Sequence, residues 1–125
     1  MKPTIKHQDI DAEFFTSERC HIIELSNSSG DPDMSIARAR VAPGVTTRWH
    51  LLKGTTERYC IVSGAGIVEV GDLPPTKVSA GDIVIIPPGC PQRITNSGTE
   101  DLVFLAICTP RYCNDVYEDL KEGPR

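Results

Sequence analysis

Residues 44–64, GVTTRWHLLKGTTERYCIVSG, decide the fold of this chain. A glycine opens the stretch, a glycine closes it, and His50 and Glu57 stand between them. A second stretch of similar design follows at residues 81–96, GDIVIIPPGCPQRITN. Glycine accepts positive φ and proline fixes an extended geometry, so both stretches indicate β-strands that end in tight corners.

The residues around these two stretches continue the β pattern. Apolar and polar side chains alternate from Met34 to Ala42, as expected of a half-buried strand, and β-forming residues fill Glu57 to Ser63. Glycine and proline turns recur between such segments, which indicates an all-β sandwich or barrel. The expected strands are Cys20–Leu25, Met34–Ala42, Val45–Leu52, Glu57–Ser63, Ile67–Val70, Thr76–Ser79, Ile83–Ile86, Gln92–Asn96 and Asp101–Cys108.

The two ends of the chain differ from this pattern. The N-terminal arm is polar but carries Phe14 and Phe15, so we expect it to dock either on its own barrel or across a dimer. The single helix candidate is Asn114–Leu120, where Asn114 is a suitable cap and the apolar residues form one stripe. We therefore expect one domain, residues 1–125, made of an arm (1–19), a barrel (34–110) and a C-terminal tail with a short helix (111–125).

Composition restricts the class of protein. The 125 residues suit one compact domain with its own core. The net charge is 13 − 17 = −4 and no basic patch stands out, so we expect no nucleic-acid partner. No apolar run approaches the ~20 residues of a membrane span, and none resembles a signal peptide. Five cysteines without a Cys-x-x-Cys pair favour a reduced, cytoplasmic protein.

The order and spacing of the two glycine-anchored stretches resemble the two signature motifs of the cupin superfamily. The resemblance covers most of the chain and is that of a small, single-domain cupin. It implies a jelly-roll barrel, the double-stranded β-helix, and it implies a homodimer. The matching patterns are Gly44-x5-His50-x-Leu52-x4-Glu57-x6-Gly64 and Gly81-x5-Pro87-x-Gly89-x2-Gln92-x3-Asn96.

The resemblance also implies a metal site that is altered in this chain. Cupins normally carry His, His, Glu and His at the positions of His50, Leu52, Glu57 and Gln92, and all four bind one metal ion. Here Leu52 offers no donor atom, whereas Gln92 still offers an amide oxygen. We therefore expect His50, Glu57 and Gln92 to hold a divalent ion, one of Zn, Mn, Fe, Co or Ni, with open positions for water or substrate.

Strand alternation adds neighbours to these positions. If His50 and Glu57 point into the barrel, then Arg48 and Tyr59 point inward as well. We therefore expect Arg48, Tyr59 and Gln92 to bind a small-molecule ligand, with Arg48 suited to a carboxylate or phosphate. The phase of the last strand stays open, so the pocket gains either Val103, Leu105 and Ile107 or Phe104, Ala106 and Cys108.

Two functions fit such a pocket. The first is a metal-binding cupin acting on a small polar substrate, as an isomerase, a lyase or an oxidoreductase, with Glu57 and Tyr59 as catalytic residues. Glu57 would serve as a general base whose pKa is raised by apolar surroundings. The alternative is a metal-free cupin that binds a small ligand, as a sensor or accessory module. A structural dimer with a vestigial pocket is a third possibility.

Overall fold

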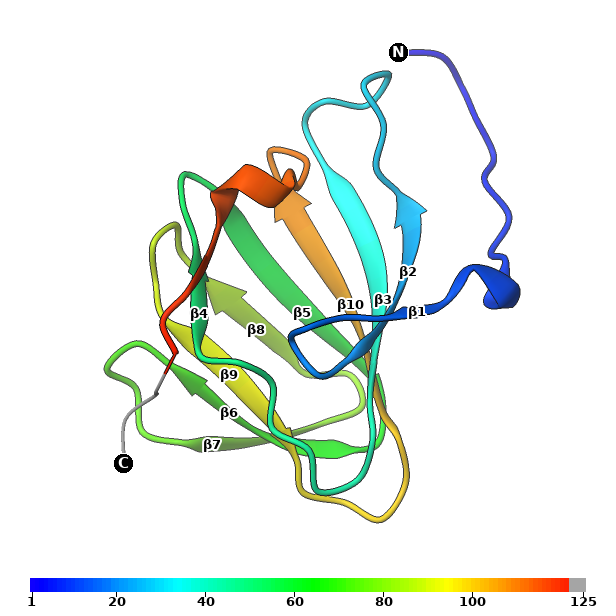
Figure 1. Ribbon diagram of the computed structural model, residues 1–125. Helices are drawn as coiled ribbons and strands as arrows, with labels where there is room; N and C mark the ends of the chain where they lie inside the picture. The colour runs from blue at the N-terminus through cyan, green and yellow to red at the C-terminus, as the bar shows by residue number, and fades with distance from the viewer. Residues whose placement is uncertain (122–125) are drawn as a thin grey trace.

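The computed structural model describes residues 1–121 and consists almost wholly of β-strands in two facing antiparallel sheets (Figure 1). The six-stranded sheet has the order β1-β2-β3-β10-β5-β8, and the five-stranded sheet has the order β11-β4-β9-β6-β7. The bounds are β1 Phe14–Phe15, β2 His21–Ser26, β3 Ser35–Val41, β4 His50–Leu52, β5 Thr56–Ser63, β6 Ala65–Val70, β7 Thr76–Ser79, β8 Ile83–Ile86, β9 Gln92–Asn96, β10 Leu102–Thr109 and β11 Tyr117–Asp119, with 3-10 turns η1 Ile10–Ala12 and η2 Asn114–Val116.

The core lies between the two sheets, where every second side chain of the central strands is buried. On β5 the buried residues include Tyr59 and Ile61, and on β9 they include Ile94. Strand β10 lies between β3 and β5, and its Phe104 is paired with Ala39 on one side and Ile61 on the other. The alternation expected from the sequence is therefore confirmed for β5 and β9.

Glycines shape the corners of the barrel. Gly64, between β5 and β6, has φ +87°, and a Cβ added there would lie 2.6 Å from the carbonyl oxygen of Asp101. Only a residue without a side chain fits such a close backbone approach. Gly44 also has positive φ, +79°, but faces open space. Gly64 is therefore favoured both by its positive φ and by the close backbone contact, whereas Gly44 is favoured by its positive φ alone.

The expected strand Val45–Leu52 is wrong in its first half. Regular pairing begins only at His50, and the preceding residues form one isolated bridge, Thr46 with Thr95. The reason is that Thr47 turns inward and its hydroxyl accepts a hydrogen bond from the backbone N–H of Ile94. This side-chain bond replaces a regular ladder bond.

The expected C-terminal helix is limited to the 3-10 turn η2. The next residues pair as a strand with β4, so that Tyr117 stands opposite Leu52 and Asp119 opposite His50. A short helix gains little stability in water, whereas the open edge of β4 offers backbone partners. The last four residues of the predicted tail, 122–125, lie outside the described residues.

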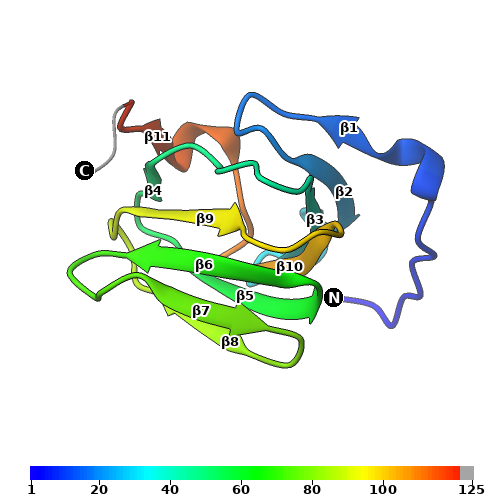
Figure 2. The same ribbon diagram turned by 90° about the horizontal axis from the view of Figure 1, so that it is seen from below.

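The last part of the N-terminal arm pairs with its own barrel. Phe14 and Phe15 pair with Ile22 and His21 as strand β1, and Figure 2 shows β1 beside β2, on the side opposite β7 and β8. Glu13 anchors the approach through a 2.6 Å ion pair with Arg40. Within residues 1–121 no helix has the length and apolar character needed to cross a membrane.

Candidate functional site

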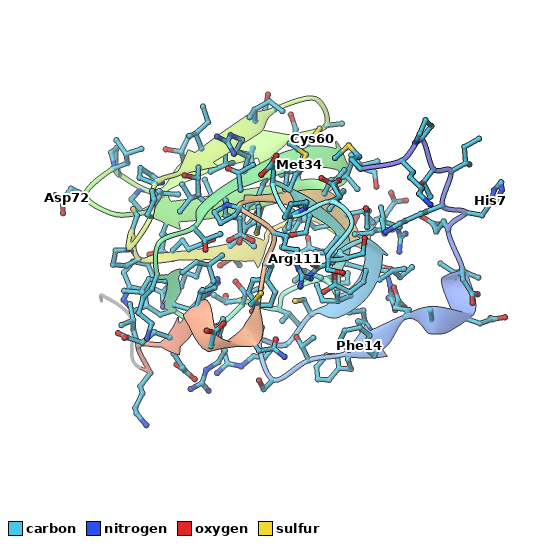
Figure 3. The ribbon with its side chains drawn as sticks, turned by 90° about the horizontal axis from the view of Figure 1, so that it is seen from above. His7, Phe14, Met34, Cys60, Asp72 and Arg111 are labelled. Atoms are coloured by element: carbon cyan, nitrogen blue, oxygen red, sulfur yellow. The ribbon has the colours of Figure 1, made fainter. Side chains whose placement is uncertain are left out.

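A cavity of about 360 Å³ lies between the six-stranded sheet, the turn after β1 and the C-terminal segment. Inward-facing side chains of the sheet, such as Ala39 and Phe104, form its floor. Phe14 of β1, labelled in Figure 3, and Tyr117 of β11 belong to its rim and walls. Small-molecule sites commonly measure about 300–1,000 Å³. The cavity is therefore the candidate functional site.

Glu57 is the buried acid of the cavity. It is only 8% exposed, although its side chain lines the cavity wall. Its Oε1 accepts a hydrogen bond from Nε2 of Gln92 at 2.5 Å, and its Oε2 lies 3.9 Å from the Cys108 thiol. Burial raises the pKa of Glu57 to about 7, because the bond from Gln92 and the charge of nearby His50 only partly offset the loss of water. At neutral pH this carboxyl can therefore either give or accept a proton.

Tyr59 and Gln92 complete a chain of hydrogen bonds that ends at Glu57. The Tyr59 hydroxyl donates to Oε1 of Gln92, and the Gln92 amide donates to Glu57. Burial raises the pKa of Tyr59 well above its usual value, so the phenol keeps its proton. Tyr59 lines the cavity and packs on Phe104 with ring centroids 4.3 Å apart. Gln92 is fully buried behind the wall and holds the two cavity residues in place.

His50 stands behind the cavity wall. Its Nδ1 lies 2.6 Å from the carbonyl oxygen of Arg48. A carbonyl oxygen only accepts, so Nδ1 carries a hydrogen, and Nε2 is the nitrogen left for another partner. The ring stacks on Tyr117, with centroids 5.1 Å apart. The two other histidines line no part of the cavity: His21 belongs to β2, and His7 stands at the outer end of the arm in Figure 3.

Arg48 does not occupy its predicted place. Its side chain forms a 2.8 Å ion pair with Asp119 and lines no part of the cavity, whereas Thr47 does. The prediction assumed regular alternation from residue 48 to residue 52, but strand β4 starts only at His50. The inward position expected for Arg48 is therefore wrong, and its contact with a ligand stays a prediction.

The predicted metal ligands come together, but they do not fit a divalent ion in this arrangement. The Gln92 amide donates its N–H to Glu57, and the Gln92 amide oxygen already accepts a hydrogen bond from the Tyr59 hydroxyl. The free donors are then one imidazole nitrogen and one carboxylate, fewer than the three protein ligands of a catalytic metal site. Across residues 1–121, no three His, Cys, Asp or Glu side chains are grouped as metal ligands. The three-ligand site stays a prediction, and the bonds of Gln92 count against it.

The last strand takes the phase that brings Cys108 into the cavity. Phe104, Ala106 and Cys108 line it, and Cys108 stands opposite Glu57 in the register of β10 and β5. Burial raises the pKa of the Cys108 thiol far above its usual value, and the charge of Glu57 adds to the effect. Such a thiol stays protonated, so Cys108 is a wall residue and not a nucleophile.

Several cavity residues come from outside the two motifs. Glu18 belongs to the turn after β1, and Tyr112 and Tyr117 belong to the C-terminal segment. Burial, together with the nearby charge of Asp119, raises the pKa of Glu18 to about 7. Apart from the aromatic pair in the arm, no sequence pattern predicts these residues, because their place depends on how β1 and β11 dock.

The comparisons with known proteins agree with the fold. The Cupin domain pattern matches residues 37–108. An uncharacterized protein of Methanocaldococcus jannaschii is 33% identical over 87 residues, which cover 70% of this chain and 69% of that protein. An oxalate-binding protein of Thermotoga maritima is 34% identical over 73 residues, which cover 57% of this chain and 58% of that protein.

Solved structures share the same architecture. A double-stranded β-helix protein of Klebsiella pneumoniae superposes with a TM-score of 0.74 at 20% identity, covering 90% of this chain and 93% of that one. Pac13, a nucleoside dehydratase of Streptomyces, superposes with a TM-score of 0.76 at 14% identity, covering 94% and 92%. At such identities the likeness concerns the fold alone. The predicted double-stranded β-helix is confirmed, and the chain belongs to the cupin family.

Proposed function

We propose that this protein is a metal-free cupin that binds a small polar molecule in the cavity and exchanges a proton with it through Glu57. The observation that carries the proposal is the bond between Gln92 and Glu57. It places a neutral amide, not a cation, against a buried carboxyl group on the wall of a cavity.

The surroundings of Glu57 suit proton transfer. A general acid or base works best when its pKa is near the working pH, and burial brings Glu57 to about 7. The Gln92 amide fixes Oε1, whereas the neighbour of Oε2 is a weakly bonding thiol at 3.9 Å. Oε2 is thus the oxygen we assign to proton exchange with a ligand. The Tyr59 hydroxyl donates its hydrogen bond to Gln92, so the phenol oxygen can accept a hydrogen bond from the ligand.

The reaction class that fits is isomerisation or elimination. Both reactions move a proton and need no electron acceptor. A single carboxyl group can carry that proton. Dehydration, the activity in the description of Pac13, is an elimination, and that analogy rests on fold alone. Oxalate, the ligand of the Thermotoga maritima relative, fits less well. It is a dianion, and within residues 1–121 the cavity wall carries no basic side chain.

A fragment screen by protein NMR tests the binding function. We expect some fragments to shift the amide signals of residues around the cavity, and we expect Ala106→Leu to abolish those shifts because it fills the cavity floor. Ala80→Leu, the same change on an exposed turn, is the matched control and should keep them. A folded native protein that binds none of the fragments would argue for a vestigial pocket.

Elemental analysis separates this function from the metal-dependent one. Protein purified without chelator should hold only traces of Zn, Mn, Fe, Co or Ni, and none of these ions should raise its melting temperature. Stoichiometric metal that disappears in His50→Ala would instead establish the site formed by His50, Glu57 and Gln92. That result would overturn the metal-free function.

We also propose that the protein forms a homodimer through the outer face of the six-stranded sheet. Three large apolar side chains are exposed there on the neighbouring strands β5 and β8, namely Val62 at 50%, Ile83 at 58% and Ile85 at 64%. Grouped apolar residues of this kind mark contact surfaces. Light scattering on Ile85→Asp should show a monomer, whereas Leu73→Asp, on the exposed turn between β6 and β7, should stay dimeric. A monomeric native protein would contradict the proposal.

A further inference from the structure

Within residues 1–121, the ionisable side chains of Asp, Glu, Lys, Arg and His type that line the cavity are all acidic. Among residues 1–121, three carboxylates and no Lys, Arg or His side chain line the cavity. Glu57 is buried, Glu18 is half-buried in the turn after β1, and Glu24 is exposed. A ligand inside the cavity therefore meets acidic groups and, within residues 1–121, no basic side chain.

Two arginines near the cavity, Arg40 and Arg48, are already paired with carboxylates. Arg48 is closest in the chain to the wall residue Thr47, but its guanidinium is paired with Asp119 at 2.8 Å. Arg40, on the outer side of β3, is paired with Glu13 at 2.6 Å and with Asp101 at 3.1 Å. Each of these cations already has a carboxylate of its own.

Glu18 and Glu57 lack such cationic partners. Throughout residues 1–121, neither forms an ion pair with Lys, Arg or His, and the Glu18 carboxylate forms no hydrogen bond. By contrast Glu13 and Glu69, both on the outside of the barrel, are paired with arginines. Buried carboxylates without a counter-charge are costly, and a bound cation would lower that cost.

The remaining wall favours the same kind of ligand. It includes four aromatic residues, Tyr59, Phe104, Tyr112 and Tyr117. Aromatic faces attract ammonium groups, and they also bury an apolar ligand body. An anion would face three carboxylates without a donor cation, which is the usual basis for rejecting a ligand.

We propose that the ligand of this cavity is a small organic cation, an amine or ammonium compound with an apolar body, whose charge is balanced by Glu18 and Glu57. The inference rests on the proposed function, because it names the ligand class of the same site. The apolar body packs on Phe104 and Tyr117. The ammonium N–H groups donate to the two carboxylates.

Three probes of one shape and different charge test the proposal on the full chain: benzylamine as the cation, benzyl alcohol as the neutral molecule and benzoate as the anion. Cyclohexylmethylamine, its alcohol and cyclohexanecarboxylate repeat the series with a saturated body. Binding is followed by NMR shifts of the cavity residues. We expect each amine to bind about tenfold or more tightly than its alcohol, and we expect no binding of the carboxylates.

Glu18→Gln removes one of the two acids without changing the shape of the side chain. It should weaken amine binding about tenfold and leave alcohol binding within about twofold. Glu100→Gln, on an exposed turn outside the cavity, removes the same charge from the protein and should change neither.

The outcomes separate the two proposals. Alcohols or carboxylates that bind in the cavity as tightly as the amines overturn the cationic ligand and leave the binding function standing. Equal weakening by Glu18→Gln and Glu100→Gln overturns the role of Glu18. Failure of all six probes, together with failure of the fragment screen, overturns the binding function and with it the inference.

Discussion

Gln92 donates a hydrogen bond from its Nε2 to Oε1 of Glu57 across 2.5 Å, and this bond joins the two sheets of the barrel. The position of Gln92 is one where the cupin resemblance implies a metal-binding histidine. In this chain it carries an amide that bonds the carboxyl group directly. The bond fixes one oxygen of Glu57 and leaves the other beside the cavity.

Gln92→His should create metal affinity that the native protein lacks. The change adds a second imidazole beside His50 and Glu57, the two-His-one-carboxylate set that binds transition metals. We expect Ni²⁺ or Zn²⁺ to raise the melting temperature of the variant by several degrees, about the shift that ~1 kcal/mol of binding energy produces in a domain of this size. Differential scanning fluorimetry with and without metal measures it. A native protein stabilised as strongly as the variant would contradict the account.

The free energy of unfolding should fall as pH rises from 4.5 to about 7. Glu57 has its pKa raised from 4.5 to about 7 in the folded protein, so the folded state binds the proton more tightly than the unfolded state. Stability from this group is full below 4.5 and is lost as pH passes 7. Glu57→Gln should remove that loss.

Urea unfolding of the native protein and of Glu57→Gln checks this. The variant should match the native protein near pH 4 and exceed it by on the order of 3 kcal/mol near pH 8, because the new amide keeps the bond to Gln92 without a charge. Glu100→Gln is the control and should follow the native curve. Equal pH dependence of Glu57→Gln and native protein would show that the pKa of Glu57 is not raised.

Tyr59→Phe should destabilise the fold by about 1–3 kcal/mol. It leaves the buried Oε1 of Gln92 without the hydrogen that the phenol supplies. Tyr112→Phe is matched, because in residues 1–121 the Tyr112 hydroxyl forms no hydrogen bond, and it should cost less than about 0.5 kcal/mol. Chemical denaturation compares the two. A cost for Tyr59→Phe no larger than for Tyr112→Phe would mean that the chain of hydrogen bonds does not stabilise the site.

Gly64→Ala should cost more than Gly44→Ala. Both positions have positive φ, which costs an alanine on the order of 1 kcal/mol. Gly64 adds a contact of 2.6 Å with the backbone oxygen of Asp101, whereas Gly44 meets nothing within 4 Å. We expect a further loss of 1–3 kcal/mol, roughly, at Gly64. Thermal unfolding compares the melting temperatures of the two variants. Equal melting temperatures would mean that the close contact with Asp101 is not a reason for glycine at position 64.

Much of the barrel was predictable because its signals are local. Gly64 requires positive φ, and the alternation through Tyr59 and Ile61 follows from the geometry of a single strand. The convergence of His50, Glu57 and Gln92 followed from the family resemblance. The prediction failed for Arg48, where a side-chain bond by Thr47 interrupts the alternation one residue before.

The acidic character of the cavity could not be predicted in the same way. Glu18 reaches it only because β1 pairs with β2, and Tyr117 only because β11 pairs with the edge of β4. Both pairings are tertiary and have no motif of their own. Strand alternation predicted the positive charge of Arg48 inside the cavity, but among residues 1–121 no Lys, Arg or His side chain lines it.

A carbon-detected NMR titration of the glutamate carboxyl groups in ¹³C-labelled protein distinguishes a metal-free Glu57 from a metal-bound one. Spectra of Glu57→Gln and Glu18→Gln assign the two signals. We expect the Glu57 carboxyl to titrate at about 7 in the protein as purified, and we expect its titration to stay unchanged when a chelator is added. A Glu57 pKa below the ordinary value of 4.5 that rises when chelator is added would contradict this expectation, because the carboxylate would then be held by a metal ion.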